Sequence, residues 1–132
     1  MSEDKPRPAF APGSHSIAAY GQGAFAFAGM SHEGSILATP KGVQPIDATS
    51  INDLDPTALA PLFTESAESP GSIEFVIVGT GEHLAPIPKA SRAALAQAGL
   101  RFEAMATGGA LRVYNVMQSE GRRVAAALIA AP

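Results

Sequence analysis

The sequence contains one run that constrains its fold more than any other, the nine residues IEFVIVGTG from Ile73 to Gly81. Five of its first six residues are apolar, and most of these are β-branched. Such a run predicts a strand buried on both faces, which is typical of a parallel sheet covered by helices. In open α/β sheets, ligands bind beyond the carboxyl ends of the strands. The run therefore predicts an architecture and a place for a site.

Length and composition predict one globular domain. The chain has 132 residues, of which 46% are hydrophobic and 16% are charged. We expect a disordered tail over residues 1–14, unlike a secretory signal or a transit peptide, and a single domain over residues 15–132. The sequence has no cysteine, which excludes disulfides and thiolate metal sites. No apolar run approaches the roughly 20 residues of a membrane-spanning helix, so we expect no direct membrane insertion.

Charge is distributed unevenly along the chain. The formal net charge is −3, made of −7 over residues 1–88 and +4 over residues 89–132. We expect the two parts to pack together and partly neutralise each other, with a basic face for an anionic partner as the alternative. Nucleic acid is not expected as a partner, because the chain is acidic and does not interleave basic with aromatic residues.

The amino-terminal part is predicted to be a β-meander. Short apolar segments alternate with glycine-containing turns, which is typical of antiparallel strands. The expected strands are 17–20, 24–27, 35–38 and 43–46, and the expected turns are 21–23, 31–34 and 40–42.

The second half alternates predicted strands and helices. A helix is predicted before the strand that begins at Ile73, with Asp55 as its N-cap and Pro56 as its first residue. Further helices are expected at 89–98, closed by Gly99, and from a cap at Thr107 to Gly121. Strands are expected at 100–105 and 124–130. This β-α-β-α-β order favours a mixed α/β sheet that is mostly parallel.

Two glycine turns form the candidate ligand site. Both are expected at the carboxyl ends of neighbouring strands, and the second opens a helix, whose free amide groups favour an anion. Neither turn matches the Walker A or the dinucleotide motif. The alternative is that the glycines only permit tight turns and close packing. The candidate residues are Gly79, Thr80, Gly81, Thr107, Gly108 and Gly109.

Catalytic and metal-binding residues are not evident. His83 is the one candidate general base near the glycine turns, and the histidines lack metal-ligand spacing. No nucleophile elbow occurs. We therefore predict no catalytic residue, no metal and no cofactor. Several polar residues lie on the last predicted helix and just after it. They predict a buried hydrogen-bond network that holds this helix against the last strand. These residues are Arg112, Tyr114, Asn115, Glu120 and Arg122.

Several short motifs occur in one order along residues 15–130. They are YGQGAF from Tyr20, GSIL from Gly34, VGTG from Val78, MAT from Met105, YNV from Tyr114 and EGRRVAAAL from Glu120. The series resembles the small Mth-domain family, which includes a mitochondrial assembly factor of respiratory complex I and an adipogenesis-associated protein. The resemblance implies a three-layer α/β domain with a mixed central sheet and an added β-meander.

The same resemblance implies no established enzymatic activity. We expect a non-enzymatic protein of the bacterial cytoplasm that binds protein partners, such as subunits of a respiratory or other membrane-associated complex, and aids assembly or biogenesis. One alternative is a binding domain, or weak enzyme, for a small anionic ligand at the glycine turns. The family commonly has an aspartate where this chain has Ala106, which argues against acid–base chemistry there. Another alternative is a homo-oligomer joined through the meander, with Phe25 and Phe27 facing the second copy.

Overall fold

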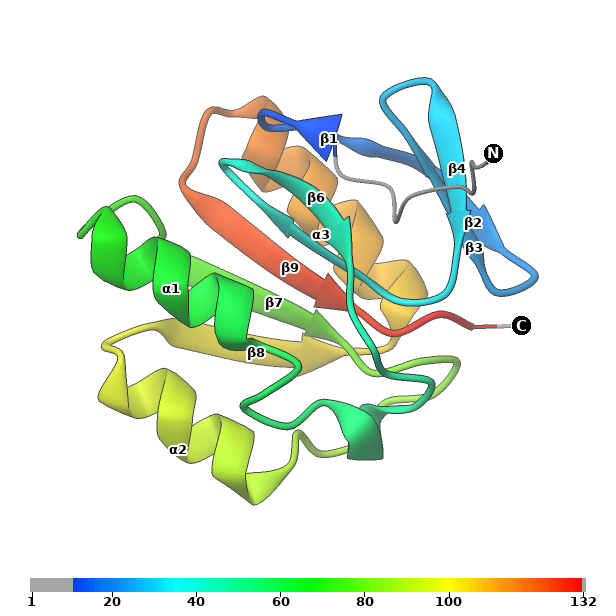
Figure 1. The fold of residues 1–132 in the computed structure, drawn as a ribbon. Coiled ribbons are helices and arrows are strands. Elements are labelled where there is room, and N and C mark those ends of the chain that lie inside the picture. Colours follow the sequence, from blue (N-terminus) through cyan, green and yellow to red (C-terminus); the bar gives the residue numbers. More distant parts are fainter. Residues whose placement is uncertain (1–10, 132) are drawn as a thin grey trace, which may run out of the picture.

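The computed structural model of the protein describes residues 11–131, which form two β-sheets and three α-helices (Figure 1). The larger sheet has the order β1-β6-β5-β9-β7-β8, and the smaller has the order β2-β3-β4. The strands are β1 (Ala11–Pro12), β2 (Ile17–Gly21), β3 (Ala24–Phe27), β4 (Met30–Glu33), β5 (Ile36–Thr39), β6 (Gly42–Pro45), β7 (Phe75–Gly79), β8 (Arg101–Met105) and β9 (Val124–Leu128). The helices are α1 (Ala60–Glu68), α2 (Lys89–Gln97) and α3 (Thr107–Ser119), with a 3-10 helix η1 at Ile51–Asp53.

The larger sheet is mixed, as predicted. Strand β7 pairs in parallel with β8 and with β9, because α2 and α3 return the chain to the amino end of the sheet. The remaining pairs, β9 with β5, β5 with β6 and β6 with β1, are antiparallel. The parallel part is therefore smaller than expected, because the β5–β6 hairpin joins the sheet directly instead of staying in a separate meander.

Helices and the smaller sheet cover the two faces of the larger sheet, giving three layers (Figure 1). Val76 and Val78 of β7 pack in one buried cluster with residues of α1 and α2, whereas Ile77 packs in the other with residues of α3 and the smaller sheet. All three side chains are fully buried. The prediction that this strand is covered on both faces is confirmed.

The predicted helix ends are partly confirmed. Gly99 and Gly121 follow α2 and α3 with positive φ values of 74° and 78°, as expected of glycines that end helices. Helix α1 begins at Ala60, later than predicted. The carboxylate of Asp55 still accepts a hydrogen bond from the amide of Ala58 (2.9 Å), but it caps a turn that precedes the helix.

The predicted meander divides between the two sheets. Residues 31–34, expected to form a turn, lie mostly in β4, which pairs with β3. The actual turn is at Ala28 and Gly29, both with positive φ, which suits a two-residue hairpin. Ala11 and Pro12, expected in the tail, pair with Val43 and Gly42 of β6. Residues 1–10 of the predicted tail lie outside the described residues.

Phe25 and Phe27 lie inside the molecule. Their side chains are 1% and 2% exposed, in the buried cluster that also contains Ile17, Ala110 and Tyr114. The prediction that these two phenylalanines face a second copy is wrong. They attach the smaller sheet to the domain instead.

Candidate functional site

The two glycine turns lie side by side, as predicted. Gly79, at the end of β7, is the register partner of Met105 in β8 and of Leu128 in β9. The amide of Thr80 donates to the carbonyl oxygen of Met105 (2.8 Å), and the amide of Thr107 donates to that of Gly81 (2.8 Å). The carboxyl end of β7 is therefore joined directly to the beginning of α3.

The hydroxyl of Thr80 is used within its own loop. It donates to the carbonyl oxygen of His83 (2.7 Å) and lies 3.2 Å from that of Met105. It also accepts a hydrogen bond from the amide of Ala85 (3.1 Å). His83 thus contributes its carbonyl group to the turn, while the residue as a whole is exposed. These hydrogen bonds fix the loop through backbone groups of His83 and Ala85.

The hydroxyl of Thr107 joins three segments of the chain. It accepts a hydrogen bond from the amide of Gly81 (2.9 Å) and donates to the carbonyl oxygen of Ile129 (2.7 Å). The residue is fully buried. Thr107 was predicted to cap α3, but the N-cap is Ala106 and Thr107 is the first helical residue. Its hydroxyl bonds to the residues that follow β7 and β9, because the ends of both strands lie against the start of the helix.

Gly79 permits the close approach of α3 to the sheet. A Cβ atom at this position would lie 2.9 Å from Thr107 Oγ1, 3.0 Å from Leu128 Cδ2 and 3.1 Å from Thr107 Cα. Real Cβ atoms essentially never show the first of these distances, and the other two, one of them to backbone, are tighter than most real Cβ contacts. Gly81 has a φ of 109°, a backbone conformation that residues with a side chain rarely adopt. Both observations support the structural interpretation of the glycines.

The groups left for an anion are the amides of Gly108 and Gly109. They lie in the first turn of α3, and no described side chain caps this helix. Helix amino termini attract anions through such amide groups and the helix dipole. A Cβ at Gly109 would meet nothing within 4 Å, so the space beside it is open. Ligand binding at the glycine turns stays a prediction that depends on these amides.

The predicted polar network divides into two groups. Tyr114 donates its hydroxyl to the carbonyl oxygen of His15 (2.9 Å). Asn115 accepts from the amide of Ile17 and donates to its carbonyl oxygen, each at 2.8 Å, much as a neighbouring strand would. Burial raises the pKa of Tyr114 to about 12. These residues attach α3 to β2 and to the segment just before it.

The arginines of the network lie elsewhere. Arg122 and Arg123 approach the carboxylate of Glu74 at 3.7 Å and 3.2 Å, and all three side chains are well exposed. Such surface pairs contribute little to stability. Arg112 and Glu120 have no side-chain partner among the described residues. The predicted network therefore does not extend to the last strand.

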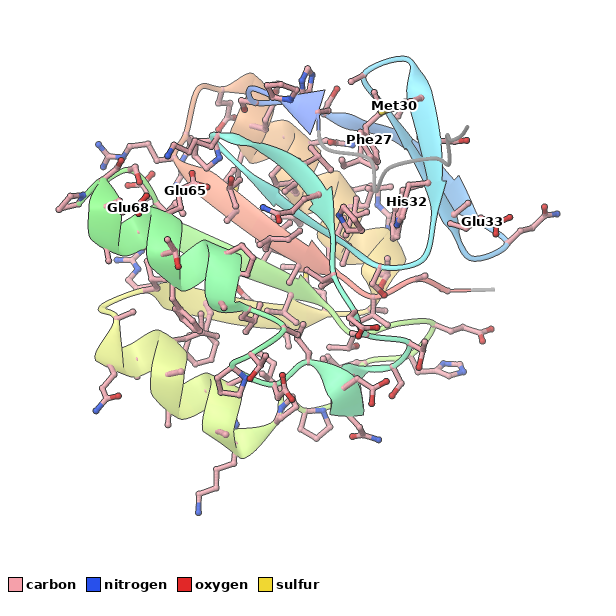
Figure 2. All side chains as sticks on the ribbon, in the orientation of Figure 1. Phe27, Met30, His32, Glu33, Glu65 and Glu68 are labelled. Carbon is pink, nitrogen blue, oxygen red and sulfur yellow. The ribbon has the colours of Figure 1, made fainter. Side chains whose placement is uncertain are left out.

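Sequence reasoning missed a buried carboxylate, Glu65, which is 7% exposed. Figure 2 labels its side chain on α1. It accepts hydrogen bonds from the hydroxyl of Thr39 (2.5 Å) and the amide of Lys41 (3.2 Å), which joins α1 to the β5–β6 turn. A cavity of about 360 Å³ lies beside it. The sequence did hold a signal for this burial. Glu65 lies three residues after Leu62, on the face of the helix where an apolar residue is expected.

Three aspartates gather near η1 and the β6 end. Asp47, Asp53 and Asp55 line two adjoining cavities of about 330 and about 410 Å³, without any Lys or Arg side chain among the lining residues. Hydrogen bonds from Thr49, and from the backbone of Ser50, lower the pKa of Asp53. Within residues 11–131, no group of His, Cys, Asp or Glu side chains has a geometry suited to a metal ion.

Comparison with known proteins identifies the family. A family model described as a protein of unknown function, DUF498/DUF598, matches residues 17–129. The chain belongs to the DUF498/DUF598 family. It is 38% identical over 125 residues to an uncharacterised protein of Rhodobacter capsulatus, across 95% of this chain and 91% of the relative.

Several solved structures share the fold of this DUF498/DUF598 member. A Bartonella henselae protein described as an outer membrane protein is 38% identical, with a TM-score of 0.85 over 92% of this chain and 99% of that chain. A Rhodopseudomonas palustris protein is 41% identical, with a TM-score of 0.77 over 100% and 94%. A Bordetella pertussis protein described as a Mth938-like domain is 26% identical, with a TM-score of 0.73 over 98% and 92%. The resemblance to the Mth-domain family is confirmed.

Among residues 11–131, none of the helices is long and apolar enough to cross a bilayer.

Proposed function

We propose that this protein acts by binding a protein partner, and that it aids the assembly or biogenesis of a membrane-associated respiratory complex. The observation that carries the proposal is the internal bonding of the site expected to hold a ligand. Both threonine hydroxyls of the glycine turns, Thr80 and Thr107, donate to carbonyl oxygens of the chain itself. A ligand bound through these hydroxyls would have to displace these bonds. The resemblance to the Mth-domain family supplies the assembly role.

The acidic surface around Asp47, Asp53 and Asp55 is the face we expect a partner to contact. Its cavities are open and carry no Lys or Arg side chain. Complementary charge across an interface speeds encounter and selects partners. A basic segment of a partner protein fits this face.

Affinity capture tests the proposal. The tagged protein is isolated from the bacterium that encodes it, and the bound proteins are identified by mass spectrometry. We expect subunits or assembly proteins of a respiratory complex, with a lower yield for Asp47→Lys. Glu120→Lys is the matched control, because it makes the same charge change at an exposed residue on the end of α3.

The proposal is contradicted if no captured protein depends on Asp47 and if deletion of the gene leaves respiratory complexes fully assembled.

A second candidate function rests on the amides of Gly108 and Gly109. Because no described side chain caps α3, a small anion is the chemistry that this end of the helix would accept. Thermal-shift measurements with phosphate, nucleotides and carboxylates separate the two functions, since only the second expects stabilisation.

A further inference from the structure

Strand β8 forms an edge of the larger sheet, and no strand of residues 11–131 pairs with its outer side (Figure 1). The carbonyl oxygen of Met105 accepts the amide of Thr80, so the backbone of Met105 faces β7. Backbone groups of a paired strand alternate in direction from one residue to the next. The amide and carbonyl groups of Phe102 and Ala104 therefore face outward, where they can pair with a further strand.

The side chains of β8 carry opposite charges two residues apart. Arg101 and Glu103 are exposed and lie on one face of the sheet, because side chains alternate along a strand. Phe102 points to the other face, where it packs partly buried against the cluster that contains Leu95 of α2. No partner within 4 Å is present for either charge among the described residues.

We propose that β8 pairs antiparallel with β8 of a second copy of this chain, about a two-fold axis at Phe102. In this register, Phe102 lies opposite Phe102 of the second copy, and their outward amide and carbonyl groups bond to each other. Arg101 lies opposite Glu103 of the second copy, and Glu103 opposite its Arg101. These two pairs occupy the non-hydrogen-bonded positions, where opposed side chains come closest. The larger sheets of the two copies become continuous.

Charge complementarity selects a second copy as the occupant. A two-fold axis brings each charge of β8 against its opposite, and this match follows from the order Arg101-Phe102-Glu103 alone. Strand β4, an edge of the smaller sheet, offers no such match, because Met30 to Glu33 contain one acid and neither Lys nor Arg. Edge strands commonly avoid pairing by carrying charged side chains, which repel when like charges meet. The mixed signs on β8 have the opposite effect.

Sedimentation of charge-reversal variants tests the pairing. The native protein is expected to dimerise with rising concentration and to dissociate with added salt. Arg101→Glu and Glu103→Arg each place like charges opposite each other in a homodimer, and we expect each to weaken dimerisation by about tenfold. An equimolar mixture of the two variants restores both attractive pairs, and it is expected to dimerise as the native protein does. A native monomer at all concentrations, or a mixture no better than its components, overturns the proposal.

Cross-linking provides a second measurement that does not depend on affinity. The chain has no cysteine, so Phe102→Cys introduces one thiol that meets its symmetry mate. Opposed residues of a hydrogen-bonded antiparallel pair have Cα atoms about 5.5 Å apart, which a disulfide can bridge. We expect mild oxidation to give a covalent dimer with Phe102→Cys and far less with Ser31→Cys, on the exposed edge strand β4. Equal cross-linking of the two variants contradicts the pairing.

Discussion

Helix α3 makes two junctions with the rest of the molecule, and they differ in burial and in what they hold. At its first residue, the fully buried hydroxyl of Thr107 bonds the ends of two central segments, Gly81 and Ile129. In its middle, the partly buried amide of Asn115 bonds both backbone groups of Ile17 in the smaller sheet. The first junction lies within the core, whereas water can reach the second. We therefore expect the first to control the stability of the whole domain and the second to control the smaller sheet alone.

Gly79 gives the largest expected effect. In Gly79→Val, the new side chain meets both Thr107 and Leu128, so we expect a loss of more than about 3 kcal/mol of unfolding free energy, at the upper end of overpacking costs. Gly79→Ala should lose about 1–3 kcal/mol. Urea unfolding measures both.

Gly109→Ala is the matched control for Gly79. Its Cβ would have open space, and alanine favours a helix over glycine by about 0.5–1 kcal/mol. We expect this variant to be as stable as the native protein or more so. If Gly79→Ala and Gly109→Ala behave alike, the close packing at the first junction does not limit stability.

Thr107→Val is the next in expected size. It keeps the shape but removes the hydroxyl, leaving the amide of Gly81 and the carbonyl of Ile129 without a partner. Unsatisfied buried groups cost about 1–3 kcal/mol each, so for these two groups we expect a loss of at least about 2 kcal/mol by urea unfolding. Thr107→Ser keeps the hydroxyl and should recover most of this loss. Equal stability of the valine and serine variants would show that the hydroxyl is dispensable.

Asn115→Ala tests the second junction. Water can replace part of the lost bonding to Ile17, so we expect a loss of about 1 kcal/mol. Hydrogen exchange should accelerate in β2 and β3 while β7 and β9 keep their protection. A uniform acceleration across both sheets would mean that the smaller sheet does not open separately, and the contrast between the junctions would disappear.

Tyr114, the neighbour of Asn115, adds a contribution to stability that depends on pH. Its pKa is raised from 10.0 to about 12 by burial, so the folded state favours the neutral phenol. The unfolded chain releases this proton first as pH rises, and the contribution is complete below about pH 10 and is lost progressively toward pH 12. The difference in stability between the native protein and Tyr114→Phe should therefore shrink over this range. A difference that stays constant from pH 9 to pH 12 contradicts the shift.

The sequence predicts those parts of the fold whose pattern is local. Two apolar runs, Ile73 to Gly79 and the one that begins at Val124, predict buried strands. Two glycines, Gly99 and Gly121, predict the ends of helices. Strand β4 was missed because Met30 to Glu33 are mostly polar, as an edge strand can be. The meander divides between two sheets because β5 pairs with β9, which is distant in the sequence. The role of Thr107 depends on the carbonyl group of Ile129, 22 residues later. Such long-range contacts leave no periodic pattern in the sequence.

The glycine turns are the region where a structural and a ligand-binding role make opposite predictions. Amide chemical shifts of Gly108 and Gly109, followed by NMR while inorganic phosphate or a nucleotide is added, distinguish them directly. If the turns serve only to join α3 to the sheet, these shifts should change little and without saturation up to millimolar ligand. Saturable shifts at submillimolar concentration, centred on these two amides, would contradict the structural role and show that this end of the sheet binds an anion.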